Sequence, residues 1–189
     1  MAKEPDDNSL STNVLKTARA LNIAGWVGFW TQLVLAIIST LILLFAVISR
    51  NSGSTGQSNP GTGAGTFLAF LGLLAVYLSI FWSYRYTLLA KKLRLADSRP
   101  TRTDIIKQLK IGLTIGFGGM FLTLLGAEAI VGVLVAKSLS QPQTAVLNIE
   151  VSRLVQPIDI FIVQANTNTI LAHFLGLIVS VWLLDRISK

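Results

Sequence analysis

The residues with the most chemical potential lie inside two long apolar segments in the C-terminal half of the chain. Glu128 is the one acid in the apolar run from Ile111 to Ala136. An ionisable side chain within a membrane span is costly, by at least about 2.5 kcal/mol, and normally faces protein or water. The segment Ile160–Leu184 adds side chains that can accept hydrogen bonds or coordinate a cation: Gln164, Asn166, Asn168, Thr169 and His173. Asp159, just before it, is a candidate entrance carboxylate.

Counting along the two segments predicts that these groups meet. Glu128 lies eight residues before Ala136, and Asn168 lies eight residues after Ile160. At about 1.5 Å per helical residue, both would be about 12 Å deep, so we expect Glu128 to contact the stretch 166–169. Three interpretations stay open for this polar cluster: an interhelical hydrogen-bond network, a path for an ion or substrate, and a contact with a partner protein.

The rarity of other reactive residues excludes several kinds of site. The chain has no cysteine and a single histidine, His173. Disulfides, thiolate metal sites, iron–sulfur clusters and multi-histidine centres are therefore excluded. We expect no enzyme activity and no required cofactor. The metal ligands, if any, are unknown from sequence; iron or another divalent ion would be held only transiently.

The composition requires a membrane fold to position these residues. Of 189 residues, 52% are hydrophobic and 13% are charged, about half the charged share of a soluble domain. Four apolar segments have the roughly 17–25 residues that cross a bilayer as a helix. We predict an all-α integral membrane protein: a cytoplasmic tail over 1–22, then one domain over 23–187, a four-transmembrane-helix bundle with spans at about 23–48, 66–86, 111–136 and 160–184.

The basic residues predict the orientation of this bundle. Thirteen lie in the two tails or between the second and third spans, and three lie on the other side. Because basic residues stay inside, both termini and the central loop are expected to face the cytoplasm. The loop has no aromatic residue from Leu88 to Lys110 on which bases could stack, so we expect no nucleic acid partner. Anionic headgroups, or a docked protein, are expected at its bases: Lys91, Lys92, Arg94, Arg99 and Arg102.

The connecting segments carry turn and capping signals. Asn59-Pro60-Gly61 marks a turn in a loop rich in glycine and serine. Thr101 and Asp104 have the spacing of a capping box that starts the third span. The amphipathic stretch Val146–Val155 predicts a short interfacial helix between spans three and four.

Small residues at a spacing of about four predict where the helices approach closely. Ala75, Ser79 and Ser83 form one such row in the second span, and Gly112 and Gly116 form another in the third. Gly132 with Ala136 would extend the second row.

Several motifs resemble one known family. They include Gly25-Trp26-Val27-Gly28-Phe29-Trp30, Phe81-Trp82-Ser83-Tyr84-Arg85-Tyr86, Ser152-Arg153-Leu154-Val155-Gln156-Pro157 and Gln164-Ala165-Asn166-Thr167-Asn168-Thr169. On these motifs the chain resembles the four-span family of the chloroplast inner-envelope translocon component also called permease in chloroplasts. The resemblance implies either preprotein import or iron uptake. The first 21 residues contain Glu4, Asp6 and Asp7, which a transit peptide would avoid, so we expect a cyanobacterial relative with no transit or cleavable signal peptide.

Two functional hypotheses follow. The first is metal-ion transport or handling, with iron as the ion, through the polar intramembrane site; four spans are few for a transporter, so a homo-oligomer is expected. The alternative is a non-transporting accessory subunit of a protein translocon or photosynthetic membrane complex. Either would reside in a cyanobacterial plasma or thylakoid membrane.

Overall fold

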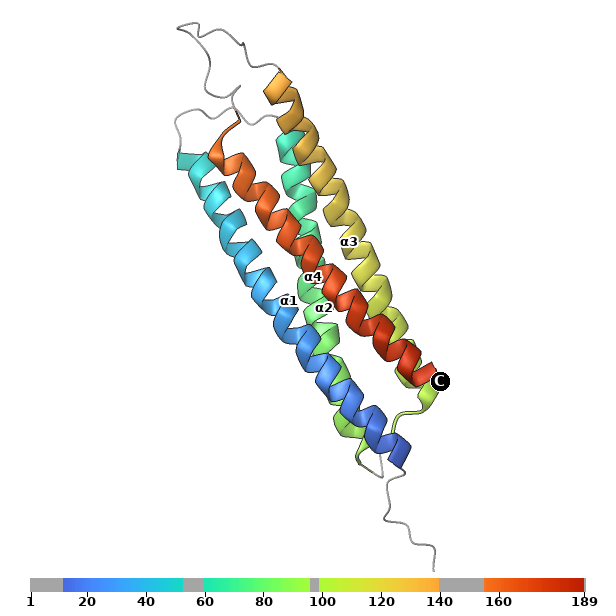
Figure 1. The fold of residues 1–189 in the computed structure, drawn as a ribbon. Coiled ribbons are helices and arrows are strands. Elements are labelled where there is room, and N and C mark those ends of the chain that lie inside the picture. Colours follow the sequence, from blue (N-terminus) through green and yellow to red (C-terminus); the bar gives the residue numbers. More distant parts are fainter. Residues whose placement is uncertain (1–11, 53–59, 96–98, 140–154, 189) are drawn as a thin grey trace, which may run out of the picture.

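The computed structural model describes residues 12–52, 60–95, 99–139 and 155–188. Over these ranges the chain forms four long helices and no strand, which confirms the predicted all-α class. They are α1 (Thr12–Ser52), α2 (Pro60–Leu93), α3 (Arg102–Leu139) and α4 (Pro157–Ser188), shown in Figure 1.

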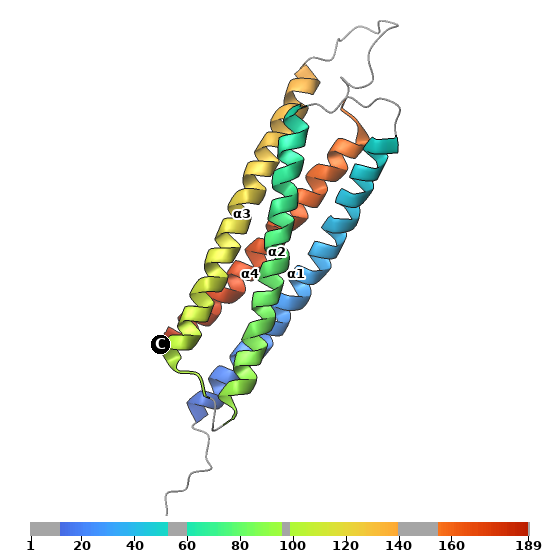
Figure 2. The ribbon, with the colours of Figure 1, turned by 180° about the vertical axis from the view of Figure 1, so that it is seen from behind.

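The helices run alternately up and down, and each packs against the next in chain order. α1 packs against α2, α2 against α3, α3 against α4, and α4 closes the ring against α1. The views from the two sides show one elongated bundle (Figures 1 and 2). The starts of α1 and α3 and the ends of α2 and α4 share one end, which we call the basic end; the other is the opposite end.

All four helices are long and apolar enough to cross a membrane, as predicted. Their lengths of 32 to 41 residues correspond to roughly 48–62 Å, which exceeds the apolar core of a bilayer, about 30 Å thick. Large apolar side chains such as Leu41, Phe67 and Phe121 are more than 60% exposed on the outside of the bundle. The predicted spans therefore mark the apolar parts of longer helices; α1, for example, begins at Thr12, within the expected tail.

Helix starts follow the local signals. The capping box is confirmed: the backbone N–H and hydroxyl of Thr101 both donate to Asp104 Oδ2, and the backbone N–H of Asp104 donates back to Thr101 Oγ1. Pro60 and Pro157 are the first residues of α2 and α4, where a missing N–H costs nothing. The predicted interfacial helix over 146–155 falls almost wholly outside the described residues.

The buried residues of each helix repeat every three to four positions. In α3 they are Ile105, Leu109, Gly112, Gly116, Gly119, Thr123, Gly126 and Ile130. This seven-residue repeat is typical of helices wound left-handed around one another. Two apolar cores result. One surrounds Leu21, Leu109 and Leu183 at the basic end, and the other surrounds Leu43 and Ile162 at the opposite end.

Candidate functional site

Besides the two apolar cores, the interior of the bundle contains buried polar residues and closely packed glycines. We call the buried polar residues Gln32, Thr123, Asn166 and His173 the polar layer. Each is at most 2% exposed. Buried polar groups are costly unless they are hydrogen-bonded, so their partners determine what this layer can do.

His173 is held by a backbone carbonyl of the facing helix. Its Nε2 atom lies 3.1 Å from the carbonyl oxygen of Gly72, in α2. Because a carbonyl can only accept, Nε2 carries the proton and Nδ1 is an acceptor. A methyl group on Gly119, in α3, would overlap the imidazole ring, so this glycine creates the space for His173. Nδ1 itself has no hydrogen-bond partner.

Asn166 ties α4 to α3 in the same way. Its Nδ2 donates to the carbonyl oxygen of Thr123 over 3.0 Å, and the Thr123 hydroxyl donates to the carbonyl of Gly119 over 2.7 Å. The Oδ1 of Asn166 has no partner. Asn166 and His173 are two turns apart on one face of α4, about 10.5 Å along the helix axis.

Gln32 brings α1 into the layer. Its Nε2 donates to Ser83 Oγ over 3.3 Å, and its Oε1 is unpaired. The amide lies against Gly176, where a methyl group would overlap it. Gly176 follows His173 by one turn of α4, so Gln32 is the next polar residue toward the basic end.

The three unpaired atoms of the polar layer have the same chemical character; Oε1 of Gln108, in α3, is also buried without a partner but lies outside this layer. Asn166 Oδ1, His173 Nδ1 and Gln32 Oε1 are all acceptors. Leaving such an atom buried and unpaired costs about 1–3 kcal/mol, so each one demands an explanation. Neutral nitrogen and oxygen donors suit a first-row divalent ion or a proton donor such as water. Among the described residues, no group of three or more His, Cys, Asp or Glu could hold a metal ion, so a tight centre is not built here.

The structure places Glu128 away from this layer, which corrects the expected contact with residues 166–169. Glu128 is exposed on the outer face of α3, whereas Asn166 faces inward and bonds to Thr123. The depth argument fixed the level of Glu128 but not its direction around the helix. With a seven-residue repeat, burial of Gly112 and Gly116 carries to Gly119, Thr123 and Gly126, and it turns Glu128 outward.

The remaining predicted polar residues of α4 divide between the two sides of the helix. Thr169 is buried, and its hydroxyl donates to the carbonyl of Ala165 over 2.8 Å. Gln164 lies on the exposed side and donates to Oδ1 of Asn168, one turn later, over 3.1 Å. The two carboxamides therefore satisfy each other outside the polar layer.

Asp159 is engaged in structure at the opposite end of the bundle. Its Oδ2 lies 3.1 Å from Nζ of Lys137, at the end of α3, and it accepts the backbone N–H of Gln156 over 3.2 Å. The carboxylate therefore caps α4 and joins it to α3. A cation that entered here would have to compete with Lys137 for the carboxylate of Asp159.

The predicted packing residues line the interior with one exception. Ser79 and Ser83 are buried, and methyl groups added to Gly112 and Gly116 would collide with Tyr86 and Leu177. A methyl on Gly119 would come within 2.7 Å of the Cβ of Ala75. Gly132 is the exception, because a methyl there would meet nothing within 4 Å. The prediction for Gly132 is therefore wrong, for the same reason as the predicted direction of Glu128.

The bases of the central loop are exposed, but Arg102 also has an internal role. Four of them are exposed at the basic end: Lys91, Lys92, Arg94 and Arg99. The guanidinium of Arg102 donates to the carbonyls of Ile187 and Ser188 and so caps the end of α4.

The sequence interpretation left Gln32, Thr123 and the glycines at 72, 119 and 176 out of the site. Gln32 carries a signal of its own, as the strongly polar residue within an otherwise apolar first span. The others have none, because a threonine or a glycine in a membrane helix is ordinary until its direction is known.

Comparison with known proteins gives one family and one relative. The family model described as "Protein of unknown function (DUF3611)" matches residues 11–188. The Arabidopsis thaliana protein named "Protein TIC 21, chloroplastic" is 36% identical over 180 residues. That alignment covers 92% of this chain and 58% of the relative, so the chain spans little more than half of that protein. No solved structure matches.

Proposed function

Since the chain belongs to the DUF3611 family and is 36% identical to Protein TIC 21 over 180 residues, we propose that it is a multi-pass membrane protein that transports or handles a metal ion. The proposed ion is iron, in its divalent state. The observation that carries this proposal is the set of three buried, unpaired acceptors: Asn166 Oδ1, His173 Nδ1 and Gln32 Oε1.

The arrangement of these acceptors fits passage better than storage. Asn166 and His173 are too far apart along α4 to bind one ion together. Gln32, in α1, packs against Gly176, which is one turn of α4 after His173. An ion would therefore meet one or two neutral donors at a time, which favours weak and reversible binding. No buried carboxylate holds it in the layer, since Glu128 faces outward.

Passage would require the helices to move. The layer is closed by direct packing, because Gly119, Gly72 and Gly176 bring the backbones against His173, Thr123 and Gln32. We propose that α4 shifts relative to α2 and α3 to let an ion approach. Such small rotations of packed helices are a common way to open a site.

Uptake of Fe²⁺ into sealed proteoliposomes under reducing conditions tests this function. Asn166→Leu removes one acceptor from the layer. Asn168→Leu is the matched control two residues away, half-buried and bonded to Gln164 outside the layer. We expect uptake above that of protein-free liposomes. Asn166→Leu should reduce the uptake rate about tenfold, which corresponds to about 1.4 kcal/mol of binding free energy lost during passage. Asn168→Leu should leave the rate unchanged. Absent uptake, or equal uptake by both variants, would refute transport.

The second candidate function is a non-transporting subunit of a protein translocon or photosynthetic membrane complex. The observation that favours it is the carboxylate of Glu128 on the outside of α3, where a neighbouring protein could meet it. A stoichiometric partner purified from native membranes, together with no Fe²⁺ uptake, would support this function instead.

We also propose the placement in the cell. The concentration of basic side chains at one end of the bundle supports a cytoplasmic location for that end and for both termini. A cyanobacterial plasma or thylakoid membrane fits this orientation. Accessibility of single cysteines at Lys92 and Lys137 to an impermeant reagent would test it, because the chain has no native cysteine.

A further inference from the structure

The outer face of α3 carries an acid at membrane depth. Six exposed positions follow one another at alternating steps of four and three residues. They form what we call the outer stripe: Phe117, Phe121, Leu124, Glu128, Val131 and Val135. Apart from Glu128 the stripe is wholly apolar, with Phe117 and Phe121 at least 60% exposed.

Glu128 has no partner in the part of the chain that the structure describes. Among the described ranges no donor or cation lies at hydrogen-bonding or ion-pair distance from its carboxylate. His173 is buried inside the bundle against Gly119, and Lys137 is paired with Asp159. Eight residues separate it from Ala136, about 12 Å along the helix, which a glutamate side chain is too short to span. Acids inside membranes normally pair with another polar group.

Other polar groups on the outside of the bundle do not share this problem. Gln164 and Asn168 bond to each other, and Thr40 lies 2.8 Å from the hydroxyl of Tyr77. In the described part of the chain, the carboxylate of Glu128 is thus an outer polar group at mid-helix without a hydrogen-bond partner, unlike these two pairs. It calls for a second molecule at that face.

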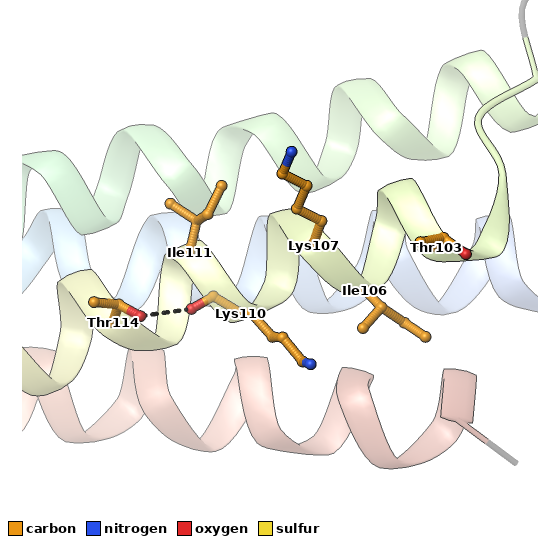
Figure 3. Close-up of a pocket in the computed structure, with 6 residues that line it drawn as sticks. All are labelled: Thr103, Ile106, Lys107, Lys110, Ile111 and Thr114. Carbon is orange, nitrogen blue, oxygen red and sulfur yellow. Dashed lines mark hydrogen bonds between the residues drawn. The ribbon is translucent and has the colours of Figure 1, made fainter.

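The geometry of the stripe permits a second helix to approach closely. Methyl groups placed on Gly118 and Gly132 would meet nothing within 4 Å, so the backbone is open on both sides of Glu128. A seven-residue spacing is what parallel, left-handed helix pairs require. Toward the basic end the face continues into a shallow hollow of about 370 Å³ lined by Thr103, Ile106, Lys107, Lys110, Ile111 and Thr114. Lys107 and Lys110 point to opposite sides there, toward α2 and α4 (Figure 3), which leaves the line between them open.

We propose that the outer stripe of α3 is the interface for a second copy of this chain, with the two Glu128 carboxyls hydrogen-bonded to each other at its centre. The uneven distribution of basic residues inserts every copy in the same direction. Two copies related by an axis along the membrane normal therefore present Glu128 at equal depth. This inference does not depend on transport.

Disulfide trapping tests the proposal directly, because the chain has no native cysteine. Leu124→Cys and Val131→Cys place a thiol on the stripe, and Leu41→Cys places one on the outer face of α1, where Leu41 is 63% exposed. In liposomes at a high ratio of lipid to protein, a membrane-permeable oxidant should produce covalent dimers from the two α3 variants and not from Leu41→Cys.

A second substitution at Glu128 separates hydrogen bonding from simple apolar contact. Glu128→Gln keeps a group that can pair with itself, whereas Glu128→Leu does not. Added to Leu124→Cys, Glu128→Leu should lower dimer yield about tenfold, and Glu128→Gln should preserve it. Leu124 and Glu128 are both exposed, so these substitutions should leave the folding of the bundle unaffected. The proposal would be overturned by monomer alone, by equal trapping through Leu41→Cys, by unchanged yield in Glu128→Leu, or by stoichiometric recovery of a different protein at this face.

Discussion

Gly119→Ala is the change that most directly probes the contact between α3 and α4. The added methyl would overlap the ring of His173 and would come within 2.7 Å of the Cβ of Ala75. The ring cannot retreat without giving up its bond to the carbonyl of Gly72. A lost interhelical hydrogen bond costs about 0.6–2 kcal/mol, and overpacking of a tight core costs about 1–3 kcal/mol. We expect a total loss of roughly 2–4 kcal/mol, allowing for partial relaxation.

The neighbouring residue supplies the control. A methyl on Gly118 meets nothing within 4 Å, and alanine is the better helix former by about 0.8–1 kcal/mol in water. Gly118→Ala should therefore leave stability unchanged or raise it. Unfolding of both variants in mixed micelles with increasing SDS, followed by helical circular dichroism, measures the difference. Equal stability of the two variants would show that α3 does not pack on His173 through Gly119.

Two further predictions concern Gln32 and the start of α3. Gln32→Leu removes a buried acceptor that lacks a partner, and it also removes the hydrogen bond to Ser83. Each change is worth about 1 kcal/mol and they act in opposite directions, so we expect stability close to that of the wild type by the same SDS titration but slower Fe²⁺ uptake; a large loss of stability would contradict this. Asp104 lies in the hydrophilic first turn of α3, where hydrogen bonds from Thr101 hold its pKa below the usual range. A lowered pKa stabilises the folded state above the unfolded pKa of about 3.9, and the effect is lost as pH falls through the folded pKa. Protection of the first-turn amides, taken relative to their intrinsic exchange rate at each pH, should therefore fall below about pH 4 in the wild type. Thr101→Ala removes the hydroxyl bonds but keeps the backbone N–H bond to Asp104, so it should weaken this pH dependence; an unchanged pH profile in the variant would refute the capping role of the hydroxyl.

The sequence was sufficient for the architecture because long apolar segments have few alternatives. Four spans, the capping box at Thr101, and the close packing at Gly112 and Gly116 could all be predicted from composition and spacing. The position of a residue along a helix could also be predicted, since each residue adds a fixed rise.

The direction of a residue around its helix was harder to predict. The seven-residue repeat of the buried positions becomes apparent only when partners are known, and small errors in period accumulate over several turns. Extending the phase of Gly112 and Gly116 by seven residues at a time reaches Gly119 and Gly126 and leaves Gly132 outside. Asn166 and His173 were recognised as polar residues, but their partners are backbone carbonyls of Thr123 and Gly72, which no side-chain pattern reveals.

The polar layer also bears on how the four helices find their correct alignment. In a bilayer, the acyl chains are as apolar as leucine side chains. The free energy of two apolar helices therefore depends little on their vertical offset. A slide of α4 by a single turn would detach Asn166 from Thr123 and His173 from Gly72 at once, and would press side chains into the space kept by Gly119. These few directional hydrogen bonds thus raise the free energy of every misaligned arrangement. They give four largely apolar helices one preferred vertical alignment.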